Sequence, residues 1–498
     1  MASVVPRFIV IESYQDVGYL SYIHEGGDAD GFMRFMKLEV TSPYAKFEVE
    51  SSNTEGLVHI RSCQSNKYWQ RTSLPSFPAG AWTATTSKEK EEDESKESCT
   101  LLKFISVDPA ANKFRIMHVQ SGCYVCKWGS EDQKFDQGML ISYKETDWQG
   151  ADVFTIIDWT SLVILPRHVA FKGCNDKYLC LYKVTSPYFG SDDIGESTVA
   201  CEIIPVKDGN IRIKSSSTGQ FFRCDAKWIW ADTYDTATDH VDSLFRPVKI
   251  DNDKIALISL CTNKFCRMLS EDGFGDALAA VEPSVIKEAQ ITVDEPVMTR
   301  KIYDVKYDLD NSRIYDNAVI VVAQNSASNL TEEPSTLDVK LTYTDTKSSS
   351  WKSAFSLTLG MKTSINLDVP EIFDGNIEFS TQVQSGVEWG KVFESTTDLE
   401  VSHSIVVPPM SKVTVNLVAT KGMCNVPFSY RQSDTLYDGS TVLTEVQGGT
   451  YYGSNYYGMK FEDNQRRYLQ GPKSNLIYIL QQERWVCLHV LSLLGFGL

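Results

Sequence analysis

The sequence has few histidines and none of the short motifs that carry common catalytic chemistry. Its seven histidines are scattered over 498 residues without the spacing of paired metal ligands. It has no glycine-rich phosphate loop, no His-Glu-x-x-His and no Gly-x-Ser-x-Gly, the signatures of nucleotide binding, zinc proteolysis and serine hydrolysis. We therefore expect no enzyme, no metal site and no cofactor.

Positive charge is also scarce. Acidic residues number 65 against 48 lysines and arginines, which leaves a net charge of −17. Nucleic-acid binding depends on basic surfaces that neutralise phosphates. The charge balance therefore argues against a nucleic-acid partner.

Long apolar runs are missing as well. No stretch of 18 apolar residues exists, so we expect no transmembrane helix. Residues 1–8 lack a basic segment followed by an apolar one, so we expect no secretory signal and a cytoplasmic protein that acts at target membranes. The twelve cysteines should then be reduced thiols. Cys123 and Cys126 have no partner pair at zinc spacing, which favours strand residues over metal ligands.

What the sequence does contain is β structure. Clusters of Gly, Asn, Asp and Ser recur about every ten residues, while helical periodicity is scarce, a pattern typical of an all-β protein. Within the first 290 residues, a polar turn followed by an aromatic residue recurs six times, every 43 to 56 residues. Six units with a break after the third favour two β-trefoils, each of three units, over a propeller. The six aromatic residues are Tyr19, Tyr68, Tyr124, Tyr178, Phe221 and Phe265.

The chain therefore divides into several parts. We predict a first trefoil at 1–157, a linker at 158–167 and a second trefoil at 168–297. Long Ser/Thr-rich alternating strands then indicate an elongated β domain at 298–463. Residues 464–498 fit none of these textures. They read equally as an amphipathic terminal helix or as a tail without selected structure.

The most regular alternation lies in residues 355–394 of the elongated domain. Two arms of about 13 residues place apolar side chains at odd positions, on either side of a turn with Asp374-Gly375. Each arm is long enough to cross a membrane as a β-strand, but an amphipathic hairpin on a soluble core would read the same. The apolar residues of the arms and of the turn are Leu357, Leu359, Met361, Ile365, Leu367, Val369, Ile372, Phe373, Ile377, Phe379, Val383 and Val387.

Several stretches of the sequence resemble known families. Residues 56–62 with 66–69, 152–159 and 169–179 resemble amaranthin-type plant agglutinins, which consist of two tandem β-trefoils. The elongated domain looks like an aerolysin-type pore-forming module, with 430–436 and 453–457 as its nearest local matches. Its organisation matches further, because that family places one amphipathic insertion hairpin where this sequence has 355–394. The whole resembles the lectin–aerolysin fusions of plants.

The resemblance implies binding of glycans that contain galactose or N-acetylgalactosamine, near a dimer interface between the first trefoil of one chain and the second of another. The first-trefoil loop, with Ser76, Phe77 and Trp82, departs from the family because it lacks an Asn-His-aromatic sequence before the tryptophan. In the second trefoil, Trp228 beside Asp225 and Lys227 supplies the aromatic face and fixed polar groups that a sugar needs. The alternative is that Trp228, like the nearby Trp230, belongs to the trefoil core.

The expected function follows from these parts. The trefoils bind glycoconjugates, chains that are dimers in solution assemble into a ring, and each inserts its hairpin into a shared β-barrel, a role that the resemblance places in plant defence. Lumen charges of Lys362 against Asp368, Glu378 and Glu388 sum to 1 − 3 = −2 per chain, which predicts cation preference. The rival hypotheses are a soluble cytosolic lectin whose last domain never inserts, and a scaffold that binds protein partners.

Overall fold

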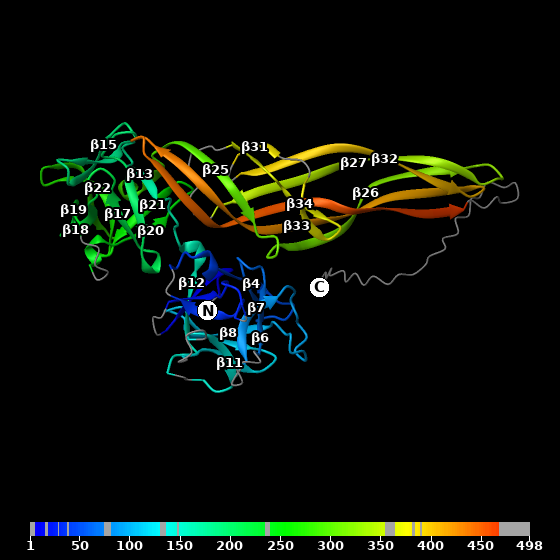
Figure 1. The fold of residues 1–498 in the computed structure, drawn as a ribbon, viewed down its shortest axis with the longest axis horizontal. Helices are drawn as coiled ribbons and strands as arrows, with labels where there is room; N and C mark the ends of the chain where they lie inside the picture. The colour runs from blue at the N-terminus through cyan, green and yellow to red at the C-terminus, as the bar shows by residue number, and fades with distance from the viewer. Residues whose placement is uncertain are drawn as a thin grey trace, which may run out of the picture.

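The protein is built from β-strands, as predicted, in a computed structural model whose described part contains five short 3-10 helices and no α-helix. Three large sheets follow one another along the chain. The first two sheets form two smaller bodies, and the third forms a long domain. In Figure 1 one small body lies beside the long domain and the other at one of its ends. The structure describes residues 5–14, 18–27, 29–36, 39–73, 81–129, 136–146, 149–234, 240–353, 364–380, 384–388 and 391–467.

The first body is a closed ring of six strands with three hairpins attached, the arrangement of a β-trefoil. Each ring strand pairs with the next, and the last pairs back with the first. The ring strands are β1 (Phe8–Ser13), β4 (Phe47–Ser51), β5 (Val58–Ser62), β8 (Leu102–Asp108), β9 (Lys113–His118) and β12 (Phe154–Asp158). The hairpins are β2 (Tyr19–Tyr22) with β3 (Met33–Met36), β6 (Tyr68–Thr72) with β7 (Trp82–Ser87), and β10 (Cys123–Lys127) with β11 (Met139–Tyr143).

The second body repeats this pattern. Its ring also closes, because β13 pairs with both β16 and β24. The ring strands are β13 (His168–Lys172), β16 (Cys201–Pro205), β17 (Ile211–Ser215), β20 (Phe245–Lys249), β21 (Lys254–Ser259) and β24 (Ile291–Asp294). The hairpins are β14 (Tyr178–Tyr182) with β15 (Ser186–Ser191), β18 (Phe221–Asp225) with β19 (Trp228–Thr233), and β22 (Lys264–Glu271) with β23 (Phe274–Glu282).

The sequence repeat marks the start of each of the six hairpins. Its aromatic residue is the first or second residue of β2, β6, β10, β14, β18 and β22. A residue with left-handed φ stands one or two positions earlier in every copy, for example Asn66 at 54° and Gly219 at 71°. Gly, Asn and Asp tolerate this conformation best, which is why the repeat carries them. Both cores are filled by the inward residues of the rings.

The connection between the trefoils is packed rather than free. Asp158 caps the short helix η2 (Trp159–Ser161) by accepting a hydrogen bond from the Thr160 amide. Val163 and Leu165 then bury their side chains in the core of the second trefoil. The predicted linker at 158–167 therefore contributes to that core.

The long domain is one sheet of unusually long strands. Its order is β25-β33-β34-β27-β32, and β26 pairs with β33. At about 3.3 Å per residue, the 26 residues of β33 span most of the domain's length in Figure 1. Its strands are β25 (Val297–Tyr307), β26 (Arg313–Asn329), β27 (Ser335–Lys352), β32 (Val392–Val407), β33 (Ser411–Leu436) and β34 (Thr441–Arg467). Strand β34 runs past the expected boundary at 463, and residues 468–498 lie outside the described part.

The strands of the long domain alternate as the sequence predicts. Val339, Leu341 and Tyr343 of β27 are buried, while Asp338, Lys340 and Thr342 between them are exposed. The buried residues pack against Ile405 of β32 and Val415 of β33 in one apolar layer. Burial of one strand face fixes the register, because a slip of one residue would turn every side chain over.

Candidate functional site

The tip of the alternating hairpin lies folded against the long domain. Its tip is a small ladder of β29 (Pro370–Phe373) with β30 (Asn376–Phe379). The turn residues Asp374 and Gly375 have φ of 45° and 82°, the left-handed geometry of a tight two-residue hairpin turn. Nearer the stem, β28 (Ser364–Leu367) pairs with β31 (Gln384–Glu388).

The tip is held by buried contacts. Ile372 is fully buried in a cluster with Trp351, Cys424 and Tyr451. Its amide donates to Oδ1 of Asn455 at 3.0 Å, and Nδ2 of Asn455 donates back to its carbonyl at 2.9 Å. These bonds fill the backbone positions that a neighbouring strand would otherwise occupy.

The tip also carries a charged contact. The carboxylate of Glu371 is 2.7 Å from the Lys347 ammonium, and Glu371 is only 9% exposed. Removing Lys347 would leave the buried Glu371 carboxylate without its partner, which is costly. The folded position of the tip is therefore specific.

The structure distributes the predicted membrane-facing residues over several environments. Val369 and Ile372 are buried, Ile377 is half-buried, and Phe373 and Phe379 are each 46% exposed. The backbones of Ile365, Leu367 and Val387 belong to the β28–β31 ladder. Leu357, Leu359, Met361 and Val383 lie outside the described residues.

The pairing of the two arms is irregular in this conformation. Ile365 pairs with Val387, but a register shift then sets Leu367 opposite Gln384. At the tip, Ile372 pairs with Ile377. The alternation is broken because the tip turns inward to bury Ile372 in the core of the domain.

The prediction of a surface role for Trp82 is wrong. Its side chain is 2% exposed and packs with Phe32, Cys126 and Leu140. The cause is the pairing of two hairpins: β7 pairs with β11, with Trp82 opposite Leu140. Side chains of the neighbouring hairpins therefore cover the indole ring of Trp82. Ser76 and Phe77, predicted in the same sugar-binding loop, lie outside the described residues.

The structure brings the second-trefoil candidates together on one hairpin. The Lys227 ammonium lies 2.7 Å from Glu271, 2.8 Å from Asp272 and 5.1 Å from the centre of the Trp228 ring. Trp228 is half-buried, with its ring 4.8 Å from that of Phe274. Asp225 is exposed.

This patch differs in two ways from the sequence prediction. Two carboxylates already neutralise Lys227, so its ammonium is less available to a ligand than we expected. Phe274, at the start of β23, completes the aromatic surface, and the sequence reasoning missed it. The signal was present: the turn Asp272-Gly273 stands directly before an aromatic residue, as in the recurring motif.

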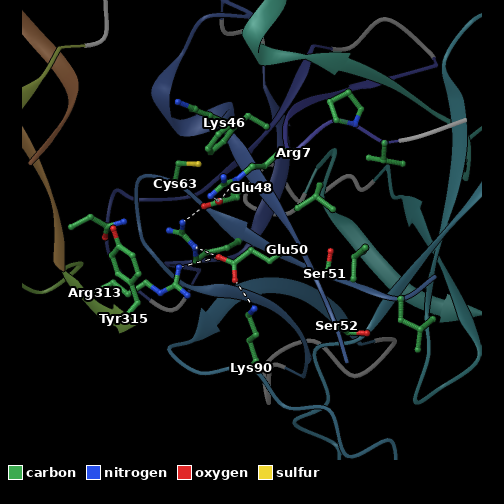
Figure 2. Close-up of a pocket in the computed structure, with 18 of the residues that line it drawn as sticks. Arg7, Lys46, Glu48, Glu50, Ser51, Ser52, Cys63, Lys90, Arg313 and Tyr315 are labelled. Atoms are coloured by element: carbon green, nitrogen blue, oxygen red, sulfur yellow. Dashed lines mark hydrogen bonds and ion pairs between the residues drawn. The ribbon is translucent and has the colours of Figure 1, made fainter. Parts of the chain in front are cut away.

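A charged cleft separates the first trefoil from the long domain, and sequence reasoning did not anticipate it. Figure 2 shows Arg313 and Tyr315 of β26 facing Glu48 and Glu50 of β4 across this cleft. It has a volume of about 1280 Å³. No motif marks these residues, because they meet only through the docking of two domains.

Glu50 is the centre of the contacts in the cleft. Its carboxylate is 3.0 Å from Arg61, 2.7 Å from Lys90 and 2.9 Å from Arg313, and it accepts a hydrogen bond of 2.9 Å from the Tyr68 hydroxyl. Burial opposes ionisation, but the bonds from Lys90, Arg313 and Arg61 outweigh it and lower the pKa of Glu50 to about 2. Glu50 is therefore a carboxylate at neutral pH.

A second cavity of about 630 Å³ adjoins the first. Lys90, Arg313, Tyr315 and Asp316 line both cavities. The second one extends to the hairpin tip, at residues 375–377. The first trefoil, the long domain and the folded tip thus meet around Arg313.

The described residues offer no evident metal or membrane-helix feature. They contain no group of three His, Cys, Asp or Glu side chains placed to hold a metal ion. Within the same ranges no helix is long and apolar enough to cross a membrane. Cys123 and Cys126 are buried free thiols of β10, which confirms that they are strand residues.

Two trefoils followed by a long β domain define the class of protein, and comparison supplies the family. The agglutinin domain model matches residues 3–158 and 164–271, more than half of the chain. The chain therefore belongs to the agglutinin-domain family, as the sequence resemblance predicted.

Individual similar proteins match smaller parts. Natterin-3 of Thalassophryne nattereri is 28% identical over 158 residues, which are 32% of this chain and 43% of that protein. The chain thus spans less than half the length of this relative. The aerolysin-like protein of Bombina maxima is similar over 32% of this chain and 97% of its own, with 18% identity and a TM-score of 0.22. Lamprey immune protein is similar over 60% and 90%, with 14% identity and a TM-score of 0.27.

Proposed function

We propose that this protein is a lectin that forms a pore, binding glycans with its trefoils and inserting the hairpin 355–394 into a target membrane. The observation that carries the proposal is the packing of this hairpin: two alternating arms end in a tip whose Ile372 is buried and bonded to Asn455. A held tip between two alternating arms fits a hairpin that is stored against the long domain and released on insertion.

The register of the neighbouring strands supports insertion. Strands β27 and β32 pair without a shift from Ser335–Val407 to Ser350–Val392. Continued into the hairpin, this register sets Leu359 opposite Val383 and Ile365 opposite Ile377. Odd residues then pair with odd ones, and one face of the extended hairpin becomes apolar while the other stays polar.

Insertion therefore amounts to a change of partner. Ile365 moves from its pairing with Val387 to a pairing with Ile377, ten residues away (387 − 377). The turn of the extended hairpin falls near Glu371, so that Ile372 and Phe373 cross the membrane first. Several chains complete a closed barrel, because only closure satisfies every backbone hydrogen bond in lipid.

The glycan is bound, in this proposal, by the second-trefoil patch of Asp225, Lys227 and Trp228, with Phe274 added by the structure. An aromatic surface beside a few polar groups suits galactose or N-acetylgalactosamine, whose C–H face stacks on a ring. The loop with Ser76 and Phe77 is the corresponding candidate in the first trefoil. The protein is a dimer before it assembles, acts from the cytoplasm on target membranes, and serves plant defence.

Two cysteine pairs test the change of partner. We would measure calcein release from liposomes that carry galactosylated lipid. The pair Ile365→Cys with Val387→Cys should form a disulfide in the soluble protein and block release until a reductant is added. The pair Ile365→Cys with Ile377→Cys should cross-link only after membrane binding, and the wild type under the same oxidant is the control.

The outcomes separate the rival functions. Release from the wild type, blocked by the first disulfide and restored by reduction, supports the pore. Wild-type protein that binds the glycolipid without releasing dye is a lectin with a silent long domain, as in the first rival hypothesis. Protein that binds no glycan but captures a specific protein partner is the scaffold of the second.

A further inference from the structure

The cleft between the first trefoil and the long domain has a charge opposite to that of the whole chain. Its lining contains four carboxylates, Glu48, Glu50, Glu55 and Asp316, against six cations. The lining of the cleft therefore has a net charge of +2, while the whole chain has a net charge of −17. The cations are Arg7, Lys46, Arg61, Lys90, Lys103 and Arg313.

The positive charge is not used up by ion pairs within the cleft. Glu48 binds Arg7 and Arg61, and Glu50 binds Arg61, Lys90 and Arg313. Two carboxylates thus form ion pairs with four cations, which leaves this group of side chains with a net positive charge.

Two lysines of the lining lie outside these ion pairs. Lys46 and Lys103 have no carboxylate within ion-pair distance among the described residues. Lys46 instead lies over the rings of Phe8 and Trp159, 4.9 and 5.0 Å from their centres. Both ammonium groups remain available to an anion.

The rest of the lining suits an organic ligand rather than a bare ion. Ser51, Ser52 and Asn425 supply hydroxyl and amide groups, and Phe104 and Tyr452 supply ring surfaces. A cleft of about 1280 Å³ exceeds the volume of most small-molecule sites. A ligand with several hydroxyl groups and at least one anionic group would match both the polar and the cationic residues of the lining.

We infer that this cleft is a second saccharide site, distinct from the Trp228 patch, and that it takes acidic saccharides carrying sulfate or carboxylate groups. Each anionic group binds at one of the cations Lys46, Lys103 and Arg7, where charge-assisted hydrogen bonds are strong. The sugar body extends toward β26 and contacts the ring of Tyr452. Because the cleft lies between two domains, a bound saccharide contacts both of them.

Isothermal titration of the full chain tests the site. The probes are a sulfated tetrasaccharide, the same tetrasaccharide after desulfation, and inorganic sulfate. We expect the sulfated form to bind about tenfold tighter than the desulfated one, and tighter than sulfate alone. Raising the salt to 1 M should remove most of that difference, because screening is then nearly complete within a few ångströms.

Two variants locate the binding. Lys46→Gln and Lys103→Gln should each weaken binding of the sulfated form roughly three- to tenfold, without loss of folding, since neither lysine holds an ion pair. Lys287→Gln, an exposed lysine of the second trefoil, is the matched control and should change nothing. Galactose binding by the Trp228 patch should persist in all three variants. A failure of this inference can therefore be told apart from a failure of the proposed lectin function.

Three results would overturn the inference. The first is equal affinity for the sulfated and desulfated forms. The second is unchanged affinity in both lysine variants. The third is a loss in Lys287→Gln as large as in Lys46→Gln, because that would show attraction to the surface at large rather than a site.

Discussion

Arg313 of the long domain forms an ion pair with Glu50 of the first trefoil, with 2.9 Å between Nη1 and Oε1. The two residues are 263 positions apart in the sequence. The other terminal nitrogen of Arg313 donates to the Tyr68 hydroxyl at 2.7 Å, and Asn66 Nδ2 donates to the Asn311 carbonyl at 2.7 Å. These bonds join the first trefoil to the long domain that carries the hairpin.

The first prediction concerns the pH dependence of this junction. Glu50 has a folded-state pKa of about 2, against an ordinary value of 4.5. A lowered pKa stabilises the folded state above the unfolded value, and this stabilisation is lost as the pH falls from about 4.5 to about 2. The full effect is on the order of 3 kcal/mol, from about 1.4 kcal/mol per pKa unit.

Glu50→Gln should therefore lower the free energy of unfolding at pH 7 by a few kcal/mol. The variant should approach the wild type near pH 2, where Glu50 of the wild type is also protonated. Glu55→Gln, which lines the same cleft but is exposed, is the control. Chemical denaturation at several pH values measures this, and a Glu50→Gln deficit that does not shrink on acidification would contradict the assignment.

The second prediction concerns the hold on the hairpin tip. Asn455 is 5% exposed and makes both hydrogen bonds to the Ile372 backbone. Asn455→Ala removes them and leaves a buried amide and carbonyl unpaired, which costs about 1–3 kcal/mol for each group. The tip should open more often, so that hydrogen exchange at Ile372 and dye release both become faster.

A matched control is available in the same domain. Gln324 is exposed and donates one hydrogen bond of 2.7 Å to Asn416. Gln324→Ala should leave exchange at Ile372 unchanged. If Asn455→Ala accelerates exchange at the tip but not dye release, opening of the tip does not limit insertion.

The third prediction separates two tryptophans. Trp82 is buried in the first trefoil, so Trp82→Ala should cost about 3–5 kcal/mol of stability. Trp228 is half-buried on the second-trefoil patch, so Trp228→Ala should cost less stability and reduce glycan binding about tenfold. Thermal unfolding and a galactose-affinity assay on both variants check this, and intact glycan binding by Trp228→Ala would remove the patch from the proposed function.

These tryptophans show where sequence reasoning ends. The repeat of six units could be predicted from the sequence, because each hairpin needs a residue with left-handed φ just before its aromatic residue, as at Asn66 and Gly219. The turn at Asp374 was readable for the same local reason. Whether Trp82 faces solvent depends on which hairpin packs beside it, and its partner Leu140 is 58 positions away (140 − 82).

The cleft and the tip site depend on contacts that are more distant still. Glu50 and Asn455 are ordinary strand residues in the sequence, and nothing near them signals a partner. Their roles arise from the docking of the first trefoil on the long domain and from the inward turn of the hairpin. Local pattern thus predicted the elements, while the sites between elements required the three-dimensional structure.

The last prediction concerns the proposed pore. In the register continued from β27 and β32, the polar face of each hairpin carries Lys362 against four carboxylates, a sum of 1 − 4 = −3 per chain. The carboxylates are Asp368, Asp374, which this register sets opposite Asp368 beside the turn, Glu378 and Glu388. A ring of such charges attracts cations and repels anions. Reversal potentials across a salt gradient should therefore show preference for cations.

Neutralising two of these carboxylates makes this prediction sharper. Glu378→Gln with Glu388→Gln brings the sum from −3 to 1 − 2 = −1 and should strongly reduce the preference, without affecting binding to glycolipid. Glu400→Gln, outside the hairpin 355–394 and in the exposed strand β32, should leave it intact. An anion-selective wild type would exclude the continued register, because that register places a net negative charge in the lumen.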